Sequence, residues 1–230
     1  IKFIKANQFD MILLSDYNKG MLTNELVEAI KKLNIPIIVD PKPINMKLFN
    51  KVFAIAPNLK EAKEITNSNT TPTEISKLIA EEYNTHVIIT QGPNGTSSYN
   101  KNTKEYNHLP TKAREVYDVS GAGDTFIAIL TLALASKAEL YEATQIANQA
   151  AGIVVGKFGT ATLTLTELKS SFKGINSKIK TREELLQIVQ KLKAKGNKIV
   201  TTNGIYDILH VGHIRLLNKA KTFGDILILA

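Results

Sequence analysis

The chain has 230 residues, of which 43% are hydrophobic and 22% charged, and this composition excludes collagen-like, low-complexity and wholly disordered proteins. It contains no cysteine, which excludes disulfide scaffolds, zinc–thiolate sites and cysteine catalysis and suits a reducing compartment such as the cytoplasm. The net charge of +8 comes mainly from scattered lysines, and no apolar run approaches the ~20 residues of a membrane-spanning helix. We therefore expect neither nucleic acid nor a membrane as a partner.

Between residues 11 and 90, short apolar runs alternate with segments of helical periodicity. Runs typical of buried strands occupy residues 11–14, 37–39, 52–56 and 87–90. Helices are expected after Thr23, near Lys60 and around Ile75, and the apolar stripes of the first and last are Leu26, Val27, Ile30 and Leu33, and Ile75, Leu78, Ile79 and Tyr83. This alternation predicts an α/β fold in which helices cover both faces of a parallel sheet.

The alternation of strands and helices is interrupted after the fourth strand. Residues 95–108 form two polar, alternating segments around residues 100–102, a pattern that predicts a hairpin. Residues 123–136 and 140–155 follow, both rich in Ala, Leu and Ile with few charges. We expect these two segments to be largely buried helices.

The C-terminal part of the sequence indicates a second unit. Residues 169–181 are polar and are expected to form a linker between a first domain, residues 1–168, and residues 182–230. In the latter range we expect a helix at 183–195, a strand at 199–202, a helix at 211–222 and a strand at 226–229. The chain begins with Ile1 rather than Met and ends within the last of these strands, so we expect a fragment of a longer polypeptide.

A glycine loop at residues 118–126 runs directly into the first apolar helix. Gly121, Ala122 and Gly123 have little or no side chain, so a phosphate can approach their N–H groups at the positive end of the helix. Asp124, in the same turn, can accept a proton from a sugar hydroxyl, and phosphoryl transfer demands little basicity. The alternative is a glycine-rich helix start with Asp124 as a capping residue.

Two further motifs follow strands three and four. Asn58 and Glu61 lie three residues apart at a helix start, where an amide and a carboxylate can orient waters on Mg²⁺, although the same pair also fits a capping box. No other direct metal ligands are expected. The fourth strand ends in a turn that contains Thr90, Gly92 and Gly95, as expected for a turn that contacts a nucleotide. The alternative is that these glycines only begin a hairpin.

Charged residues follow the first two strands. Ligands of α/β proteins bind where parallel strands end, so these side chains can face a phosphate or a sugar. The alternative is that they are ion-paired loop residues. The candidates are Asp16, Lys19, Asp40 and Lys42.

The second unit contains its own candidate site. His210 and His213 lie three apart at a helix start and share one face, from which imidazoles can stabilise a leaving pyrophosphate. Gly212 between them removes a side chain that would block a nucleotide, and Gly204 lies in the preceding loop. A metal site is disfavoured because no third ligand is near in sequence, and a pair of core histidines is the remaining alternative.

The order of the motifs in residues 10–168 resembles the ribokinase-like (PfkB) sugar kinases. These motifs are Asn-x-x-Glu, Thr-x-Gly-x-x-Gly and Gly-Ala-Gly-Asp-Thr-Phe. The resemblance implies that Asp124 is the catalytic base, that residues 121–123 form the anion hole and that ATP and Mg²⁺ are required. It also implies that the N-terminal half of such a kinase, with most sugar contacts, lies outside the chain. The residues implied to serve ATP and Mg²⁺ are Asn58, Leu59, Lys60, Glu61, Thr90, Gly92, Gly95 and Asn148. For Asn148, an ordinary helix amide is the alternative.

Residues 204–213 resemble the signature Gly-x-Phe-Asp-x-x-His-x-Gly-His of a family of nucleotidyltransferases, with Tyr206 in place of Phe. The resemblance implies a Rossmann-like domain that joins a substrate phosphate to the α-phosphate of ATP or CTP and releases pyrophosphate. Later motifs of that family would lie beyond residue 230. The residues implied to bind phosphate are Gly204, Tyr206, His210, Gly212 and His213.

The two domains together resemble the bifunctional heptose kinase–adenylyltransferases of bacterial ADP-heptose synthesis, which supplies the lipopolysaccharide inner core. The resemblance implies phosphorylation of D-glycero-β-D-manno-heptose 7-phosphate at O1, adenylylation of the resulting 1-phosphate, and a homodimer of the full-length protein. Two other functions stay open. One is another sugar or nucleoside kinase with a non-catalytic C-terminal module. The other is a non-catalytic protein that binds phosphate or nucleic acid, suggested only by the basic charge.

Overall fold

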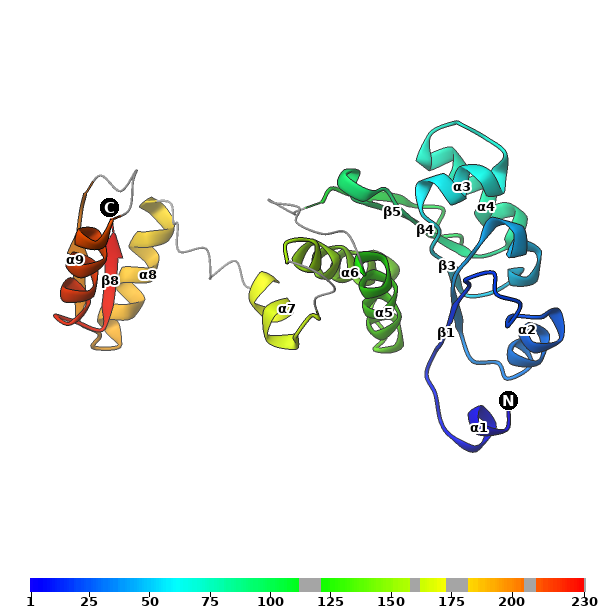
Figure 1. The fold of residues 1–230 in the computed structure, drawn as a ribbon, viewed down its shortest axis with the longest axis horizontal. Helices are drawn as coiled ribbons and strands as arrows, with labels where there is room; N and C mark the ends of the chain where they lie inside the picture. The colour runs from blue at the N-terminus through cyan, green and yellow to red at the C-terminus, as the bar shows by residue number, and fades with distance from the viewer. Residues whose placement is uncertain (112–120, 158–161, 173–181, 205–209, 230) are drawn as a thin grey trace. The chain divides into compact units, whose positions relative to one another are not determined.

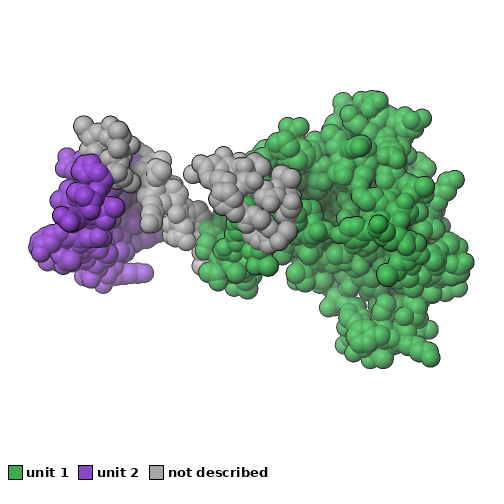
Figure 2. All heavy atoms as spheres, viewed as in Figure 1, with its two compact units in different colours: residues 1–173 green, residues 174–230 purple. Residues whose placement is uncertain are grey.

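The computed structural model describes residues 1–111, 121–157, 162–172, 182–204 and 210–229. The chain divides into two compact units, residues 1–173 and residues 174–230, coloured separately in Figure 2. Each unit is described by itself. None of the helices in the described part of the chain has the length and apolar character needed to cross a membrane.

Unit 1 is built on a six-stranded sheet in which the strands follow one another in chain order. The first four strands are parallel, and the last two are antiparallel to their neighbours, so the sheet is mixed rather than wholly parallel as predicted. The turn from Gly92 to Gly95 folds the chain back so that β5 runs antiparallel to β4, and the hairpin predicted around residues 100–102 pairs β5 with β6. The strands are β1 (Ile12–Ser15), β2 (Ile37–Asp40), β3 (Ala54–Ile55), β4 (His86–Thr90), β5 (Thr96–Tyr99) and β6 (Tyr106–Leu109).

Helices cover both faces of this sheet, as the alternation of strands and helices predicted (Figure 1). Successive strand residues point to opposite faces, so Ile37 and Val39 pack in one core and Ile38 packs in the other. The first core is completed by α2 (Asn24–Lys31), the 3₁₀ helix η1 (Pro43–Phe49), α3 (Leu59–Thr66) and α4 (Pro72–Tyr83). The second is completed by α5 (Ala122–Ala135) and α6 (Leu140–Val155).

The remaining elements of unit 1 are short. They are α1 (Lys2–Ala6), η2 (Gly92–Asn94) and α7 (Leu165–Phe172). Helix α7 occupies four residues that the sequence assigned to a linker, because Thr164 and Glu167 form reciprocal hydrogen bonds at its start. Lys157 reinforces this start through an ion pair of 2.6 Å with Glu167.

Some apolar side chains are more exposed than predicted. Leu78 of α4 is 46% exposed although the predicted stripe included it, and Leu132 of α5 is 62% exposed. The rest of each pattern holds, since Ile75 and Ile79 of α4 are fully buried, as is Leu130 of α5. A helix that covers a sheet buries one stripe, so even an apolar sequence leaves its outward positions in solvent.

Unit 2 contains a two-stranded parallel sheet between helices. Its strands pair in register from Ile199 with Ile226 to Thr202 with Leu229. The strands and helices predicted for this part of the chain are present, with helix ends shifted by one residue. The elements are α8 (Arg182–Ala194), β7 (Ile199–Thr202), α9 (Val211–Lys221) and β8 (Ile226–Leu229).

Candidate active site

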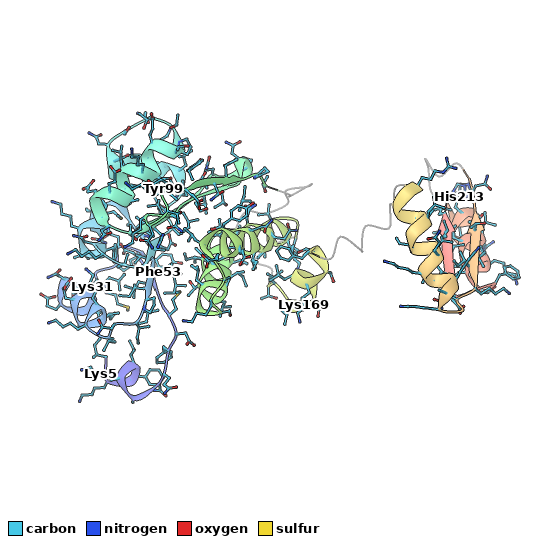
Figure 3. All side chains as sticks on the ribbon, turned by 180° about the vertical axis from the view of Figure 1, so that it is seen from behind. Lys5, Lys31, Phe53, Tyr99, Lys169 and His213 are labelled. Atoms are coloured by element: carbon cyan, nitrogen blue, oxygen red, sulfur yellow. The ribbon has the colours of Figure 1, made fainter. Side chains whose placement is uncertain are left out.

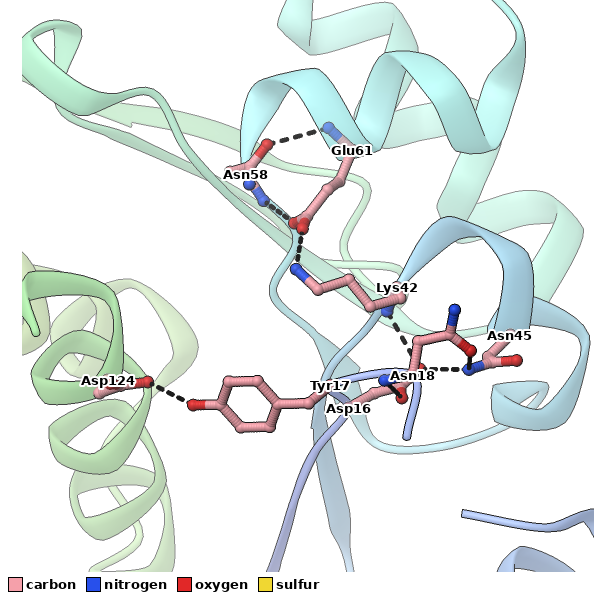
Figure 4. A network of polar contacts seen from close by, with 8 residues as sticks. All are labelled: Asp16, Tyr17, Asn18, Lys42, Asn45, Asn58, Glu61 and Asp124. Carbon is pink, nitrogen blue, oxygen red and sulfur yellow. Dashed lines mark hydrogen bonds and ion pairs between the residues drawn. The ribbon is translucent and has the colours of Figure 1, made fainter. Parts of the chain in front are cut away.

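The carboxyl ends of β1 to β4 meet at one edge of the sheet in unit 1. Ser15 pairs with Asp40, so the loops after β1 and β2 begin side by side. An isolated bridge joins Asn58, beyond β3, to Thr90 at the end of β4. This edge is where open α/β sheets bind ligands. Figure 4 shows the polar network that results.

The side chain of Asp16 connects the loops that follow β1 and β2 by hydrogen bonds. Its side chain is buried, with 4% of the residue exposed. One carboxylate oxygen accepts the backbone N–H of Asn18 at 2.8 Å, and the other accepts the N–H of Lys42 at 3.2 Å and the side-chain amide of Asn45 at 2.9 Å. Both oxygens therefore accept hydrogen bonds from neutral protein groups, and the ion pair that was the alternative for this residue is absent among the described residues.

Asn58 and Glu61 form a capping box, which was one of the two interpretations of their spacing. Asn58 Oδ1 accepts the N–H of Glu61 at 2.9 Å, and Glu61 Oε2 accepts the N–H of Asn58 at 3.0 Å. The second oxygen of Glu61 accepts the ammonium of Lys42 at 2.5 Å, and this hydrogen bond raises the pKa of Lys42. The capping box therefore leaves one carboxylate oxygen for a cation.

Asp40 lies beside this ion pair among other carboxylates. Burial, and then the charge of Glu61, raises its pKa to about 6, with Asp124 and Asp16 adding smaller effects in the same direction and Lys42 opposing them. Glu61, Asp40 and Asp16 all act on the ammonium of Lys42, so three carboxylates from different elements lie near one cation. Such a cluster favours the binding of a further cation.

The residues present fit magnesium held through water and phosphate rather than by a protein cage. In the described part of the chain, no three His, Cys, Asp or Glu residues are grouped so as to hold a metal ion directly. Glu61 Oε1 nevertheless holds a cationic group already, the ammonium of Lys42. Mg²⁺ characteristically keeps several waters and takes one or two carboxylates together with substrate phosphates, which suits Asn58 and Glu61.

Asp124 lies in the first turn of α5 and is exposed. Gly121 is the N-cap residue, in the left-handed region at φ 76°, and a Cβ added to Gly121 or Gly123 would meet nothing within 4 Å. The N–H groups of a first helical turn have no partner within the helix, so this open start can receive an anion. Ala122 is half-buried between the two glycines.

Tyr17 reaches Asp124 from the opposite side of the site. Its phenolic O–H donates to Asp124 Oδ1 at 3.2 Å, across a separation of 107 residues (Figure 4). The sequence assigned no role to Tyr17. The signal in the sequence is its position in the loop after β1, next to Asp16.

The nucleotide candidates form a connected row along β4, β5 and α6. Thr90 pairs with Thr96, and the hydroxyl of Thr96 donates to Asn148 Oδ1 at 3.1 Å. The side-chain amide of Asn148 also donates to the carbonyl of Pro110 at 3.1 Å, so both ends of the amide hold protein groups. This bonding agrees with the alternative of an ordinary helix amide.

The two glycines of the turn after β4 differ. Gly92 faces open space, but a Cβ on Gly95 would lie 2.0 Å from the carbonyl oxygen of Leu109. Gly95 is therefore required by the close approach of the hairpin strands. Among the other candidates, Lys19 and Lys60 are exposed, and Leu59 packs against the first core.

In unit 2, His210 is the N-cap of α9 and its Nδ1 accepts the N–H of Gly212 at 3.1 Å. The rings of His210 and His213 stack with centroids 3.9 Å apart (His213 is labelled in Figure 3). A Cβ on Gly212 would lie 2.9 Å from the His210 ring, so this glycine makes room for an imidazole. Gly204 is exposed, and Tyr206 lies outside the described residues.

Residues 2–168 match the sequence profile of the pfkB family of carbohydrate kinases. The chain belongs to this family. The members of this family are carbohydrate kinases that use ATP, typically with Mg²⁺, and the chain shares their sequence profile. Its described fold agrees: it superposes on the ribokinase of Thermotoga maritima with a TM-score of 0.62 at 27% identity, over 72% of this chain and 57% of that one.

The PfkB chain is also similar to larger proteins. It is 39% identical over 237 residues to the bifunctional protein HldE of Geotalea uraniireducens, covering 97% of this chain and 48% of that protein. It is 42% identical over 234 residues to the bifunctional protein HldE of Campylobacter jejuni subsp. doylei, covering 97% of this chain and 50% of that protein. The chain thus spans about half the length of the curated relatives it matches.

Proposed function

We propose that the chain is part of a bifunctional transferase of ADP-heptose synthesis. Its first activity is the ATP-dependent phosphorylation of D-glycero-β-D-manno-heptose 7-phosphate at O1. Its second is the adenylylation of the resulting heptose 1-phosphate, with release of pyrophosphate. One observation carries the proposal: the similarity to bifunctional HldE proteins extends over 97% of the chain and therefore includes most of unit 2 as well as unit 1.

The chemistry of the first step is assigned to the start of α5. Asp124 accepts the proton of the sugar hydroxyl at C1, and the hydroxyl oxygen forms a bond to the γ-phosphorus of ATP. The bond between that phosphorus and the β,γ-bridging oxygen breaks, and ADP leaves with its electron pair. The exposure of Asp124 supports this role, because a base must be reached by the substrate.

The backbone at residues 121–123 is assigned to the transferring phosphoryl group. The space in front of Gly121 and Gly123 is open, and the helix start presents N–H groups and a positive dipole end. Such preorganised donors stabilise the charge that develops in the transition state. In the absence of a side chain at these positions, the phosphate oxygens can reach the backbone.

Lys42, Asn58 and Glu61 are assigned to the phosphates of the nucleotide. Asn58 and Glu61 would hold Mg²⁺ through its waters, and the ion neutralises charge on the β- and γ-phosphates when bound. Lys42, whose ammonium is bonded to Glu61, is 41% exposed along its side chain and can turn to a phosphate oxygen. Thr90 and Gly92 border the same edge, and Lys19 and Asp40 are the candidate sugar contacts.

The second step is assigned to the start of α9. Nδ1 of His210 accepts the backbone N–H of Gly212 and therefore carries no proton. In a neutral imidazole the proton then resides on Nε2. That N–H, together with the ring of His213, is proposed to stabilise the departing pyrophosphate. Gly204 and Tyr206 complete the proposed phosphate-binding segment.

The test measures both products with the full-length protein. We expect ADP to form from ATP with D-glycero-β-D-manno-heptose 7-phosphate, and not with mannose 6-phosphate, which serves as the control lacking the seventh carbon. Addition of further ATP should then release pyrophosphate in an amount equal to the heptose 1-phosphate consumed. ADP formation with another sugar and no pyrophosphate would instead identify a different kinase with a non-catalytic C-terminal module.

A further inference from the structure

Tyr17 and Asp124 are the two ends of a contact that spans the active-site edge. The phenolic O–H of Tyr17 donates to Asp124 Oδ1 at 3.2 Å, and among the described residues this is the side-chain partner of Asp124 (Figure 4). Tyr17 comes from the loop after β1, whereas Asp124 comes from the first turn of α5. The hydrogen bond therefore joins a loop and a helix start that meet only in the folded protein.

The loop that carries Tyr17 is held by buried groups. The N–H of Asp16 donates to the carbonyl of Asp40 at 2.9 Å, which continues the pairing of β1 with β2 by one residue. The Asp16 carboxylate, 4% exposed, then fixes the next turn by accepting the N–H of Asn18 and the amide of Asn45. The phenol is thus presented from a fixed backbone, one residue beyond an anchored position.

Asp124, by contrast, has little else to orient it. It is exposed, and within the described residues it forms no salt bridge. A free carboxylate samples a broad range about its terminal torsion, and a base that must meet a hydroxyl within hydrogen-bond distance loses rate when it is misoriented. A donor bound to one oxygen selects a single orientation and leaves the second oxygen for the substrate.

We propose that Tyr17 is a positioning residue that orients the carboxylate of Asp124 for proton transfer from the sugar hydroxyl. A carboxylate offers about four lone-pair positions, so the phenol and the substrate can bind together. A contribution of the ring to folding is a weak alternative, since Tyr17 is 62% exposed and its ring buries little apolar surface. The inference rests on the proposed role of Asp124.

The test uses Tyr17→Phe in the full-length protein, because this change removes the hydroxyl and keeps the ring. We expect kcat of the kinase step to fall about five- to twentyfold while KM for ATP and for the sugar phosphate change less than about twofold, as for an interaction needed in the transition state. Tyr141→Phe, at another exposed tyrosine on α6, is the matched control and should leave both parameters unchanged.

A double-mutant cycle shows whether Tyr17 acts through Asp124. In an Asp124→Ala background, the residual kinase rate should be the same with Tyr17 or Phe at position 17. The inference is overturned if Tyr17→Phe has wild-type kcat, or if it lowers the residual rate of Asp124→Ala by the same factor as in the wild type. Wild-type turnover by Asp124→Ala itself would instead remove the proposed base, and with it the function assigned to α5.

Discussion

At the start of α5 two glycines face open space, whereas at the start of α9 the glycine is covered by the imidazole of His210. Both segments combine small residues with a polar side chain at a helix start, and from sequence both suggest a phosphate site. In the structure, Gly123 leaves room for a ligand, but Gly212 leaves room for the protein's own side chain. A glycine at a helix start therefore indicates that another group comes close to the backbone. It does not indicate whether that group is a ligand or a side chain of the protein.

The largest effect that separates these two helix starts is expected from Gly123→Ala. A methyl group there meets no atom of the described residues, so folding should be unaffected or improved by up to about 1 kcal/mol through helix propensity. It would occupy the space assigned to the phosphoryl group, and we expect kcat of the kinase step to fall by about 10²-fold, as when an oxyanion donor is lost. Steady-state kinetics and denaturant unfolding measure the two quantities.

The control for this variant is Ala135→Gly at the other end of α5, which lowers helix propensity away from the phosphate site. It should cost about 1 kcal/mol in unfolding free energy and leave kcat unchanged. Wild-type kcat in Gly123→Ala would contradict the assignment of the open space to the transferring group.

A smaller effect, on stability, is expected from Gly212→Ala in unit 2. The new Cβ would lie 2.9 Å from the His210 ring and displace it, so the N-cap hydrogen bond would be lost at a cost of about 1 kcal/mol. Hydrogen exchange of the α9 amides in the full-length protein measures this loss locally.

The same substitution should have the opposite sign once the imidazole is absent. In a His210→Ala background, Gly212→Ala meets no ring and should slow exchange in α9, because alanine favours the helix by up to about 1 kcal/mol. Equal effects in both backgrounds would show that the contact with His210 does not explain the glycine.

A further expected effect concerns Asp40, at the edge of the α5 site, and depends on pH. Its pKa is raised from 3.8 to about 6, so between these values the folded state binds more protons than the unfolded state. The contribution of this group to stability is therefore fully present below pH 3.8 and is lost as the pH rises through about 6. Asp40→Asn should gain stability over the wild type progressively from pH 4 to pH 7.

The comparison of Asp40→Asn with the wild type also controls for other titrating groups. Burial lowers the pKa of His86 to about 4, which gives stability that falls as the pH falls from 6.5, but this slope is common to both proteins and cancels in their difference. Urea unfolding at several pH values measures that difference. A difference that is constant with pH would mean that Asp40 is not desolvated in solution.

The local pattern of the sequence was sufficient for much of the fold. The continuous apolar run of residues 37–39 predicted a buried strand, and Ile38 lies against one layer and its neighbours against the other because side chains alternate along a strand. The hairpin after Gly95 was also predicted. Helix α7 and the 3₁₀ helix η1 were not, since short segments stabilised by caps and buried contacts carry little periodicity.

The location of the candidate site could be predicted from the sequence, whereas most of its side-chain contacts could not. The positions of Asp16, Lys42 and Glu61 after strand ends predicted that they lie at a common edge of the sheet. Their spacing in the sequence does not indicate that Asp16 holds two loops together or that Lys42 pairs with Glu61. The contact between Tyr17 and Asp124 joins residues 107 positions apart, and only tertiary structure brings them together. Local motifs reveal residue types suited to a reaction, while their partners depend on the fold.

The central claim is that Asp124 at the open start of α5 is the base of phosphoryl transfer, and Asp124→Asn in the full-length protein tests it most directly. With γ-labelled ATP and heptose 7-phosphate, the wild type should transfer the label to the sugar. The variant should bind ATP with unchanged affinity, transfer label on the order of 10²–10⁴ times more slowly, and still adenylylate supplied heptose 1-phosphate at the wild-type rate. Label transfer by the variant at the wild-type rate would contradict the account.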